Sequence, residues 1–353
     1  MASRPPSLRT VAKAAQVSIA TVSRVVNSVA TVDPKLRRRV ERVIRELGYR
    51  PNAIASAIMQ GFRRPRGRQH RGTLALLSYH PEKEWHRDEL YYYREFERGA
   101  RERAERIGYD INVFCLNSPG VSPARLAGIL EARGIAGVLL LPLPQRTESL
   151  AFPFERFASI KIGYMLQTPQ LHRVTTDYVL HLAQVLQHID AAGYERIGYV
   201  VDELVEERLA RLAQAHFLLH QQQVPRSRRV PLYSGQLLGN AAGSKPFLRW
   251  WKEHRPDVVV CQHLQPYFWL RDEGVRFPAD SGFAAITTRP GHPEVSGMMP
   301  CLDEIAATGV ELLSHAVLHR DHGVPSFQRS VLICGTWHEG STLRPARPGI
   351  GSS

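Results

Sequence analysis

The sequence has few of the residues that cross-link a small extracellular fold. Its 353 residues include only four cysteines, at Cys115, Cys261, Cys301 and Cys334. They form no C-x-x-C pair and no cluster with histidine, so the pattern indicates neither a disulfide framework nor a zinc site. We therefore expect reduced thiols in a cytoplasmic protein.

Long apolar runs are also missing. The longest, GVLLLPL, is far too short to span a bilayer, and the first ten residues, MASRPPSLRT, lack the apolar core of a secretory signal. These absences predict a cytoplasmic location and no membrane partner.

Known catalytic signatures are absent as well. The chain contains no G-x-G-x-x-G, P-loop, G-x-S-x-G or H-E-x-x-H motif. Its fifteen histidines do not cluster at ligand spacing; His315 and His319 stand four residues apart on an expected helix, but without a nearby carboxylate. We predict that the protein is not an enzyme and that it holds no metal and no cofactor.

Acidic residues are scarce at one end of the chain only. Residues 1–72 hold 16 of the 46 Lys and Arg residues but only 3 of the 33 Asp and Glu residues, so the net charge of +13 arises there. A basic end on a neutral body indicates a module that binds a polyanion. A basic tail that is merely solvated is the alternative interpretation.

The first fifty residues have the pattern of three short helices. The first covers 8–15, the second begins at the capping residue Ser18 and carries a valine stripe, and the third begins at Asp33-Pro34 and is rich in arginine. A tight turn between the first two predicts a helix-turn-helix, whose second helix can enter the major groove of DNA. An ordinary three-helix bundle with a wet, charged face is the competing interpretation.

The second helix has an outward face suited to DNA. Ile19, Ala20 and Arg24 point away from the valine stripe, where arginine can bond guanine and small apolar groups can touch thymine methyls. Four polar residues can hold phosphates: Ser18, Thr21, Ser23 and Asn27. A further helix of small residues, too short to be stable alone, is expected near 52–59 and is slim enough for a minor groove.

Two runs carry a family resemblance, LRTVAKAAQVSIATVSRVVN and YRPNAIASAI. Together they closely resemble the DNA-binding segment of the lactose-repressor (LacI/GalR) family of bacterial transcription regulators, without gaps from about Ser7 to Ile58. The resemblance implies that Ile19, Ala20 and Arg24 read bases and that Thr31 joins the phosphate-binding residues. Two positions depart from the family: Gln16 replaces a glycine common in the turn, and Ser56 replaces a long polar residue.

The resemblance also implies a hinge helix in the minor groove, where Asn52, Ala55 and Ile58 would contact DNA. Ile58 stands where the family usually has a leucine that wedges between base pairs and kinks the duplex. A basic linker containing glycine and proline follows, at 61–72, and can lie along the phosphate backbone.

From residue 73 onward, short apolar runs alternate with helical stretches, and the rhythm restarts near residue 167. Repeated βα units predict parallel sheets, and two sets predict two lobes with ligand room where the carboxyl ends of the strands meet. We expect an amino-terminal all-α helix-turn-helix domain and an α/β two-lobed body that is similar to the family's periplasmic-binding-protein-like body. The expected boundaries are 1–50 for the helix-turn-helix, 51–71 for hinge and linker, 72–345 for the body with lobes at about 72–166 and 167–340, and 346–353 for a flexible tail.

The candidate ligand residues of the body come from two sources. The unusually aromatic segment SYHPEKEWHRDELYYYRE offers Tyr79, Trp85 and Tyr91, whose rings could stack on a sugar, although the three tyrosines at 91–93 could equally be core or subunit interface. The family resemblance adds Arg211, and it adds Gln262 and His263, which stand where sugar-binding members often have an Asn-Asp pair.

The combined expectation is a dimeric transcription regulator, a repressor, that binds a palindromic double-stranded operator in the bacterial nucleoid. A sugar-like small molecule in the cleft between the lobes would modulate its affinity for DNA. The alternative is a DNA-binding regulator without a small-molecule effector, either constitutive or controlled by a protein partner. No heptad-bearing helix follows Arg347, which favours a homodimer over a tetramer.

Overall fold

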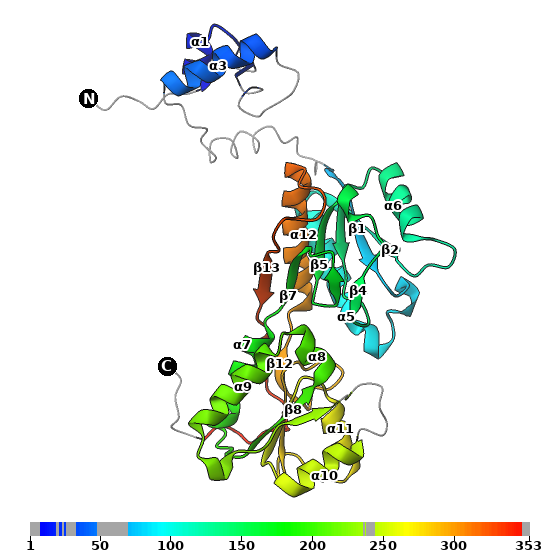
Figure 1. The fold of residues 1–353 in the computed structure, drawn as a ribbon, viewed down its shortest axis with the longest axis vertical. Coiled ribbons are helices and arrows are strands. Elements are labelled where there is room, and N and C mark those ends of the chain that lie inside the picture. Colours follow the sequence, from blue (N-terminus) through cyan, green and yellow to red (C-terminus); the bar gives the residue numbers. More distant parts are fainter. Residues whose placement is uncertain are drawn as a thin grey trace, which may run out of the picture. The chain divides into compact units, whose positions relative to one another are not determined.

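The computed structural model divides into an amino-terminal unit, Met1–Gln69, and a body, His70–Ser353 (Figure 1). The structure describes residues 8–18, 21–22, 25, 33–47, 70–235, 237 and 244–347. Within these ranges, no helix is long and apolar enough to cross a membrane.

The amino-terminal unit is organised around a small apolar core. Helices α1 (Leu8–Ala14) and α3 (Pro34–Glu46) pack against a second helical segment that includes Thr21, Val22 and Val25. Among the residues that the structure describes in this unit, six side chains are buried in the core: Val11, Ala12, Ala15, Val22, Val25 and Val40. The predicted valine stripe is therefore confirmed at the two of its positions that the structure describes.

The cap predicted for the third helix is present. One carboxylate oxygen of Asp33 accepts the backbone N–H groups of Lys35 at 2.9 Å and Leu36 at 3.1 Å, which satisfies two amides that have no partner within the helix.

The body contains two six-stranded sheets and a small two-stranded one (Figure 1). The first sheet has the order β13-β7-β5-β3-β1-β2, all parallel, with β1 at Gly72–Ser78, β2 at Tyr109–Cys115, β3 at Gly137–Leu140, β5 at Ala158–Ile162, β7 at His172–Thr176 and β13 at Ser330–Ile333. The second has the order β14-β12-β11-β10-β8-β9, with β8 at Ile197–Asp202, β9 at Tyr233–Gly235, β10 at Val258–Cys261, β11 at Gly282–Ala285, β12 at Ser296–Met299 and the antiparallel β14 at Thr336–His338. Strands β4 (Thr147–Ser149) and β6 (Leu166–Thr168) form the small sheet.

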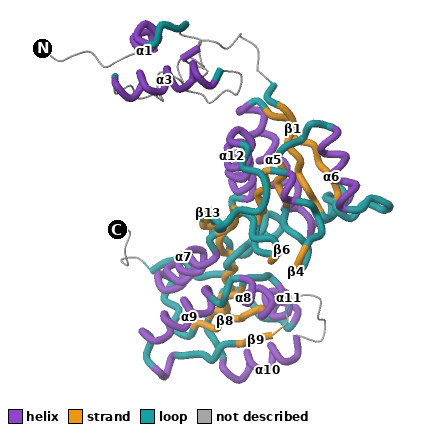
Figure 2. Tube along the Cα trace, turned by 45° about the horizontal axis from the view of Figure 1, so that its top comes forward, coloured by secondary structure: helices purple, strands orange, loops and turns teal. Residues whose placement is uncertain are grey.

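Helices cover both faces of the first large sheet (Figure 2). Helices α5 (Tyr91–Ile107) and α12 (Leu302–His319) bury one face, and α6 (Pro123–Ala132) buries the other. The contact between α5 and α12 is close, because a Cβ atom at Gly99 would lie 2.0 Å from the carbonyl oxygen of Asp303. Three short 3-10 turns complete this lobe, at Glu82–Glu84 (η1), Asp88–Leu90 (η2) and Phe154–Arg156 (η3).

The second large sheet is covered in the same way. Helices α7 (Tyr178–Ala191) and α9 (Leu212–Gln223) pack on one face, and α10 (Ser244–His254) and α11 (Gln265–Asp272) pack on the other. Helix α8 (Glu203–Arg208) and the turn η4 (Arg226–Arg228) complete this lobe. The predicted α/β two-lobed architecture is thus confirmed.

The chain crosses between the lobes three times: from Thr176 to Tyr178, from Met299 to Leu302, and from Ile333 to Thr336. The predicted lobe ranges, 72–166 and 167–340, were wrong on this point. Strands β7 and β13 lie in the first sheet, and α12, drawn in orange, packs against α5 and the first sheet (Figure 1). Sequence order cannot reveal such returns, because α12 buries its apolar face in the first lobe and not in the lobe that precedes it along the chain.

Candidate functional sites

The turn of the amino-terminal unit places its second helix. Gln16 has a φ of +52°, a left-handed conformation that glycine adopts without steric cost. Ser18 follows as the predicted cap: its hydroxyl oxygen accepts the backbone N–H of Thr21 at 3.1 Å, and its carbonyl accepts that of Val22 at 3.2 Å. Gln16, which replaces the family's glycine, therefore adopts a backbone conformation that is strained for any residue with a Cβ atom.

Two of the predicted phosphate ligands lie side by side. The hydroxyl oxygens of Ser18 and Thr21 are 2.9 Å apart, at the start of the second helix. The other predicted DNA contacts lie outside the described residues: Ile19, Ala20, Arg24, Ser23, Asn27, Thr31, Asn52, Ala55 and Ile58.

Basic side chains cover the outer surface of α3. Arg38, Arg39, Arg42 and Arg45 are exposed, whereas Val40 on the opposite side is fully buried. The arrangement gives this helix a cationic face, as its sequence predicts.

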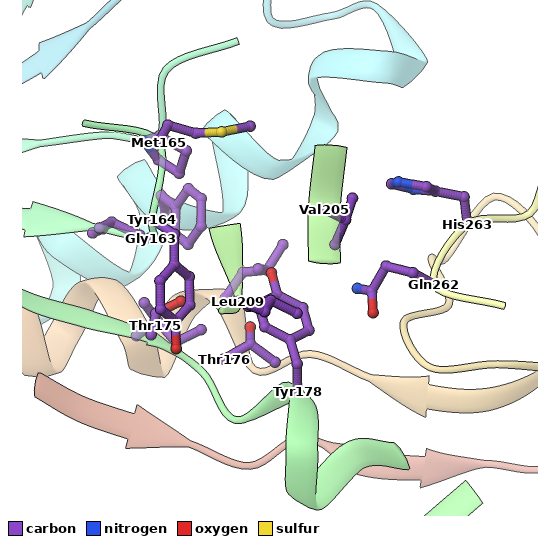
Figure 3. Close-up of a pocket in the computed structure, with 15 residues that line it drawn as sticks. Gly163, Tyr164, Met165, Thr175, Thr176, Tyr178, Val205, Leu209, Gln262 and His263 are labelled. Carbon is purple, nitrogen blue, oxygen red and sulfur yellow. The ribbon is translucent and has the colours of Figure 1, made fainter. Parts of the chain in front are cut away.

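The cleft between the lobes holds two adjoining cavities, of about 170 and 510 Å³. Both are lined by residues that follow the carboxyl ends of parallel strands: Pro142 after β3, Thr176 at the end of β7, and Gln262 and His263 after β10. This is the edge at which α/β folds bind ligands, and the larger volume suits a small organic molecule. Figure 3 shows Gln262 and His263 on the opposite side of the smaller cavity from Tyr164 and Met165.

The second lobe contributes the polar wall. The side-chain amide of Gln262 donates to the hydroxyl of Thr287 at 3.0 Å, which fixes the orientation of the amide. The Nε2 atom of His263 lies 4.0 Å from a carboxylate oxygen of Asp202, which is itself buried at the end of β8. The predicted pair Gln262-His263 therefore does line the cleft.

The first lobe contributes aromatic side chains. Tyr91 and Tyr92 line the larger cavity, and Phe96 lines both cavities. Burial raises the pKa of Tyr91 to about 12, although the positive charge of Arg289 opposes the shift. Tyr91 is therefore a neutral phenol at neutral pH, with a hydroxyl that can donate a hydrogen bond in the cleft.

Three of the predicted ligand residues do not line the cleft cavities. Trp85 is only 2% exposed; its ring stacks on Tyr93 with centroids 5.4 Å apart, and its Nε1–H donates to the carbonyl of His80 at 3.0 Å. Tyr79 packs against the core of the first lobe on the α6 side. Aromatic side chains that follow a strand can therefore pack in the core instead of lining a ligand site.

Arg211 is the third such residue. Its side chain is exposed and bonds Gln214 at 3.1 Å, and its backbone lies in the left-handed region (φ +59°) between α8 and α9. The buried carboxylate of Glu206 accepts the amide of Gln214 at 3.1 Å and the hydroxyl of Tyr199 at 2.9 Å. These bonds stabilise the first turn of α9, which begins at Leu212, and Arg211 lies in the break between α8 and α9.

Other cleft residues were not identified from the sequence: Glu89, Tyr164, Met165, Thr176, Tyr178 and Arg289. Glu89 lies in η2, but the other five stand at or just beyond the ends of β5, β7 and β11, and that position is the signal that could have found them. Among the described residues, no group of three or more His, Cys, Asp or Glu side chains could hold a metal ion.

The comparison with known proteins agrees with this architecture. Residues 7–52 match the family model described as "Bacterial regulatory proteins, lacI family". This amino-terminal segment is thus similar to the DNA-binding region of that family. It is 29% identical over 205 residues to the HTH-type transcriptional regulator CelR of Thermobifida fusca, a match that covers 56% of each chain. It thus spans little more than half the length of this curated relative.

Solved structures of the family share the fold. A complex of the transcriptional regulator CelR with cellobiose superposes with a TM-score of 0.57 at 20% identity, over 96% of this chain and 99% of that one. The Lac repressor dimer bound to operator and the anti-inducer ONPF gives a TM-score of 0.52 at 17% identity, over 96% and 100%. The helix-turn-helix class and the periplasmic-binding-protein-like body expected from the sequence are therefore confirmed.

Proposed function

We propose that this chain is a sequence-specific DNA-binding transcription regulator, a repressor that acts as a homodimer on a palindromic operator in the bacterial cytoplasm. The observation that carries the proposal is the match of residues 7–52 to the family model, together with the packing and basic surface of the amino-terminal unit. Two identical recognition helices related by two-fold symmetry read two identical half-sites, which explains the palindrome.

In this proposal the second helix lies in the major groove. Arg24 bonds a guanine edge, Ile19 and Ala20 contact base edges, and the paired hydroxyls of Ser18 and Thr21 hold a phosphate. The hinge residues Asn52, Ala55 and Ile58 occupy the minor groove, and Ile58 kinks the duplex at the centre of the operator.

We further propose that a sugar-like molecule binds in the cleft and changes the affinity of the protein for DNA. A cavity of about 510 Å³ with aromatic faces, a fixed amide at Gln262 and a neutral phenol at Tyr91 can stack on a sugar ring and bond its hydroxyls. The cellobiose complex of a protein with the same fold supports this class of ligand.

The second candidate is a regulator without a small-molecule effector. Thr287 and Thr288 stand near the positions where the resemblance expects two carboxylates, and much of the cleft lining is apolar. A cavity that serves only as packing space between the lobes would have this lining as well.

Selection of bound sequences from a random duplex library tests the DNA-binding proposal. The full-length protein, at fixed near-physiological salt, should recover a palindrome with a central pyrimidine–purine step, since such steps kink readily. Recovery of unrelated sequences would leave only non-specific binding by the basic end and would overturn the proposal.

The selected duplex then serves as the probe for an effector. We expect a panel of mono- and disaccharides, cellobiose included, to contain one that changes operator affinity in the wild type and fails to do so in Tyr91→Phe. Trp85→Phe is the matched control, because its ring lies in the core and not in the cleft. Equal responses of wild type and Tyr91→Phe would remove Tyr91 from the ligand site, and no response of the wild type to any sugar would favour the second candidate.

A further inference from the structure

A histidine lies fully buried where the connections between the lobes meet. His181 belongs to the first turn of α7, which begins directly after the first crossover, and its exposed fraction is 0%. Its imidazole is within hydrogen-bond distance of two backbone groups from distant parts of the chain, Ile286 and Gly335.

The two backbone partners fix the state of the ring. The Nδ1 atom lies 2.9 Å from the carbonyl oxygen of Ile286, which can only accept, so Nδ1 carries a proton. The Nε2 atom lies 2.8 Å from the backbone N–H of Gly335, which can only donate, so Nε2 presents its lone pair. The neutral imidazole with its proton on Nδ1 is the single form that makes both bonds.

Each partner belongs to a segment that the lobe arrangement depends on. Ile286 follows β11 and immediately precedes Thr287, Thr288 and Arg289, which line the larger cleft cavity. Gly335 lies in the third crossover, between β13 of the first lobe and β14 of the second. One rigid ring therefore joins the cleft loop at 286–289 to a connection between the lobes.

The second crossover is pressed against the same point. A Cβ atom at Gly335 would lie 2.1 Å from the carbonyl oxygen of Met299, where the second crossover starts, and 2.9 Å from Nε2 of His181. No side chain fits there, so the third crossover, the second crossover and the imidazole are in direct contact. If one of them moves, the others must move too, because atoms in such close contact would otherwise clash.

We propose that His181 is a positioning residue that holds the cleft loop 286–289 in register with the crossovers between the lobes, and that protonation of its Nε2 releases the crossover while the loop stays bound. The regulatory consequence, transmission of cleft occupancy to the lobe arrangement, rests on the function proposed above. The two hydrogen bonds themselves exist whether or not a ligand binds.

The surroundings of the ring keep it neutral at neutral pH. Burial is the largest effect and lowers the pKa of His181, while the bond to Ile286 and the negative charge of Asp177, on the turn before it, oppose the shift. Tyr178 on the same helix contacts the ring edge, with centroids 6.4 Å apart, and Cys334 on the third crossover has a thiol whose pKa burial raises. Only a pH well below neutrality charges the ring, and protonation then places an Nε2–H against the N–H of Gly335.

Two substitutions separate the two bonds. A glutamine side chain, in His181→Gln, places its amide near the position of Nε2 and can still accept from Gly335, but it does not reach Ile286 at the same time. An asparagine, in His181→Asn, places its amide near Nδ1 and can donate to Ile286, but leaves Gly335 without its acceptor. Each variant is the matched control of the other.

Hydrogen exchange of the full-length protein, without DNA or sugar, measures both segments. We expect His181→Asn to lose about tenfold protection at Gly335, the value of one hydrogen bond of about 1.4 kcal/mol, and to keep wild-type protection over 287–289. His181→Gln should show the reverse. As the pH of the folded wild type is lowered, its protection at Gly335 should fall toward that of His181→Asn, after correction for the intrinsic pH dependence of exchange, and neither variant should change its pattern with pH.

The outcomes decide between coupling and simple packing. If both variants lose protection equally in both segments, His181 only fills space, and the proposal is overturned. Wild-type protection at Gly335 in His181→Asn, or a pH response that persists in both variants, would overturn it equally. None of these results depends on operator or effector binding, so a failure of the proposed function is seen separately, in the selection and sugar experiments.

Discussion

The amino-terminal unit and the body differ in net charge and in how their apolar side chains are packed. The unit has a strongly basic sequence, and its described residues include six buried apolar side chains. The body has balanced charge, and four apolar clusters of its described residues pack the two large sheets against their helices. A small core stabilises little, and excess like charge destabilises the unit that carries it. In the proposed function, the unit presents its basic surface to DNA, and the body shapes the cleft for a ligand.

The difference predicts where substitutions act. In the body, a buried side chain supports the cleft through packing, so its removal should lower the free energy of unfolding of the body. In the amino-terminal unit, the exposed face carries the proposed DNA contacts. Substitutions there should change the affinity for DNA and leave the free energy of unfolding nearly unchanged. The three predictions below test this contrast, from the largest expected effect to the smallest.

The largest effect is expected for Trp85→Ala in the body. Loss of a fully buried indole that stacks on Tyr93 should lower the free energy of unfolding of the body by about 3–5 kcal/mol. Denaturant titration followed by tryptophan fluorescence measures this, because all five tryptophans lie after residue 84 and report on the body alone. A loss below about 1 kcal/mol would mean that the ring is not core and would return Trp85 to the candidate ligand residues.

Arg24→Ala should come next, and its effect should fall on DNA binding. We expect operator affinity to weaken by about 1–3 kcal/mol, with relaxed preference at one base of each half-site, while the unfolding transition stays unchanged. Binding to the selected duplex and to single-base variants of it provides the measurement. An equal loss on every sequence would identify Arg24 as a phosphate contact.

The smallest effect is expected for Asp33→Ala. Removal of the carboxylate that caps α3 leaves two backbone amides without their side-chain acceptor and should cost the amino-terminal unit about 1 kcal/mol. Thermal unfolding of the full chain, followed by far-ultraviolet circular dichroism, measures this loss if the transition of the amino-terminal unit is resolved from that of the body. Asp33→Ser, which retains a capping oxygen, should recover most of the loss.

Local signals predicted most of the elements correctly. The apolar runs at 109–115 and 158–164 became β2 and β5, and the helical pattern at 178–192 became α7, because periodicity and end signals act over a few residues. Strand β7 was missed: HRVTT is short and polar in part, and it is a strand because β5 and β13 pair with it on either side.

The cleft was predicted less completely than the elements. Gln262 and His263 line the cleft, and the sequence pointed to them because they follow an apolar strand that a family resemblance could anchor; their role in ligand binding stays a prediction. Trp85 and Arg211 do not line the cleft. An indole can pack in a core as well as stack on a sugar, so the sequence could not place Trp85. The break before Leu212, in which Arg211 lies, depends on the hydrogen bonds of the buried Glu206.

The sequence by itself determined the basic helix-turn-helix, the caps at Ser18 and Asp33, and the α/β class of the body, because each depends on neighbours in the chain. Only the tertiary structure decided which lobe owns α12 and β13, which aromatic rings face the cleft, and which backbone groups meet His181. The lobe that holds β13 and the partners of His181 depend on contacts between residues more than one hundred positions apart. No local pattern determines such contacts, because burial and hydrogen bonding there depend on how the whole body packs.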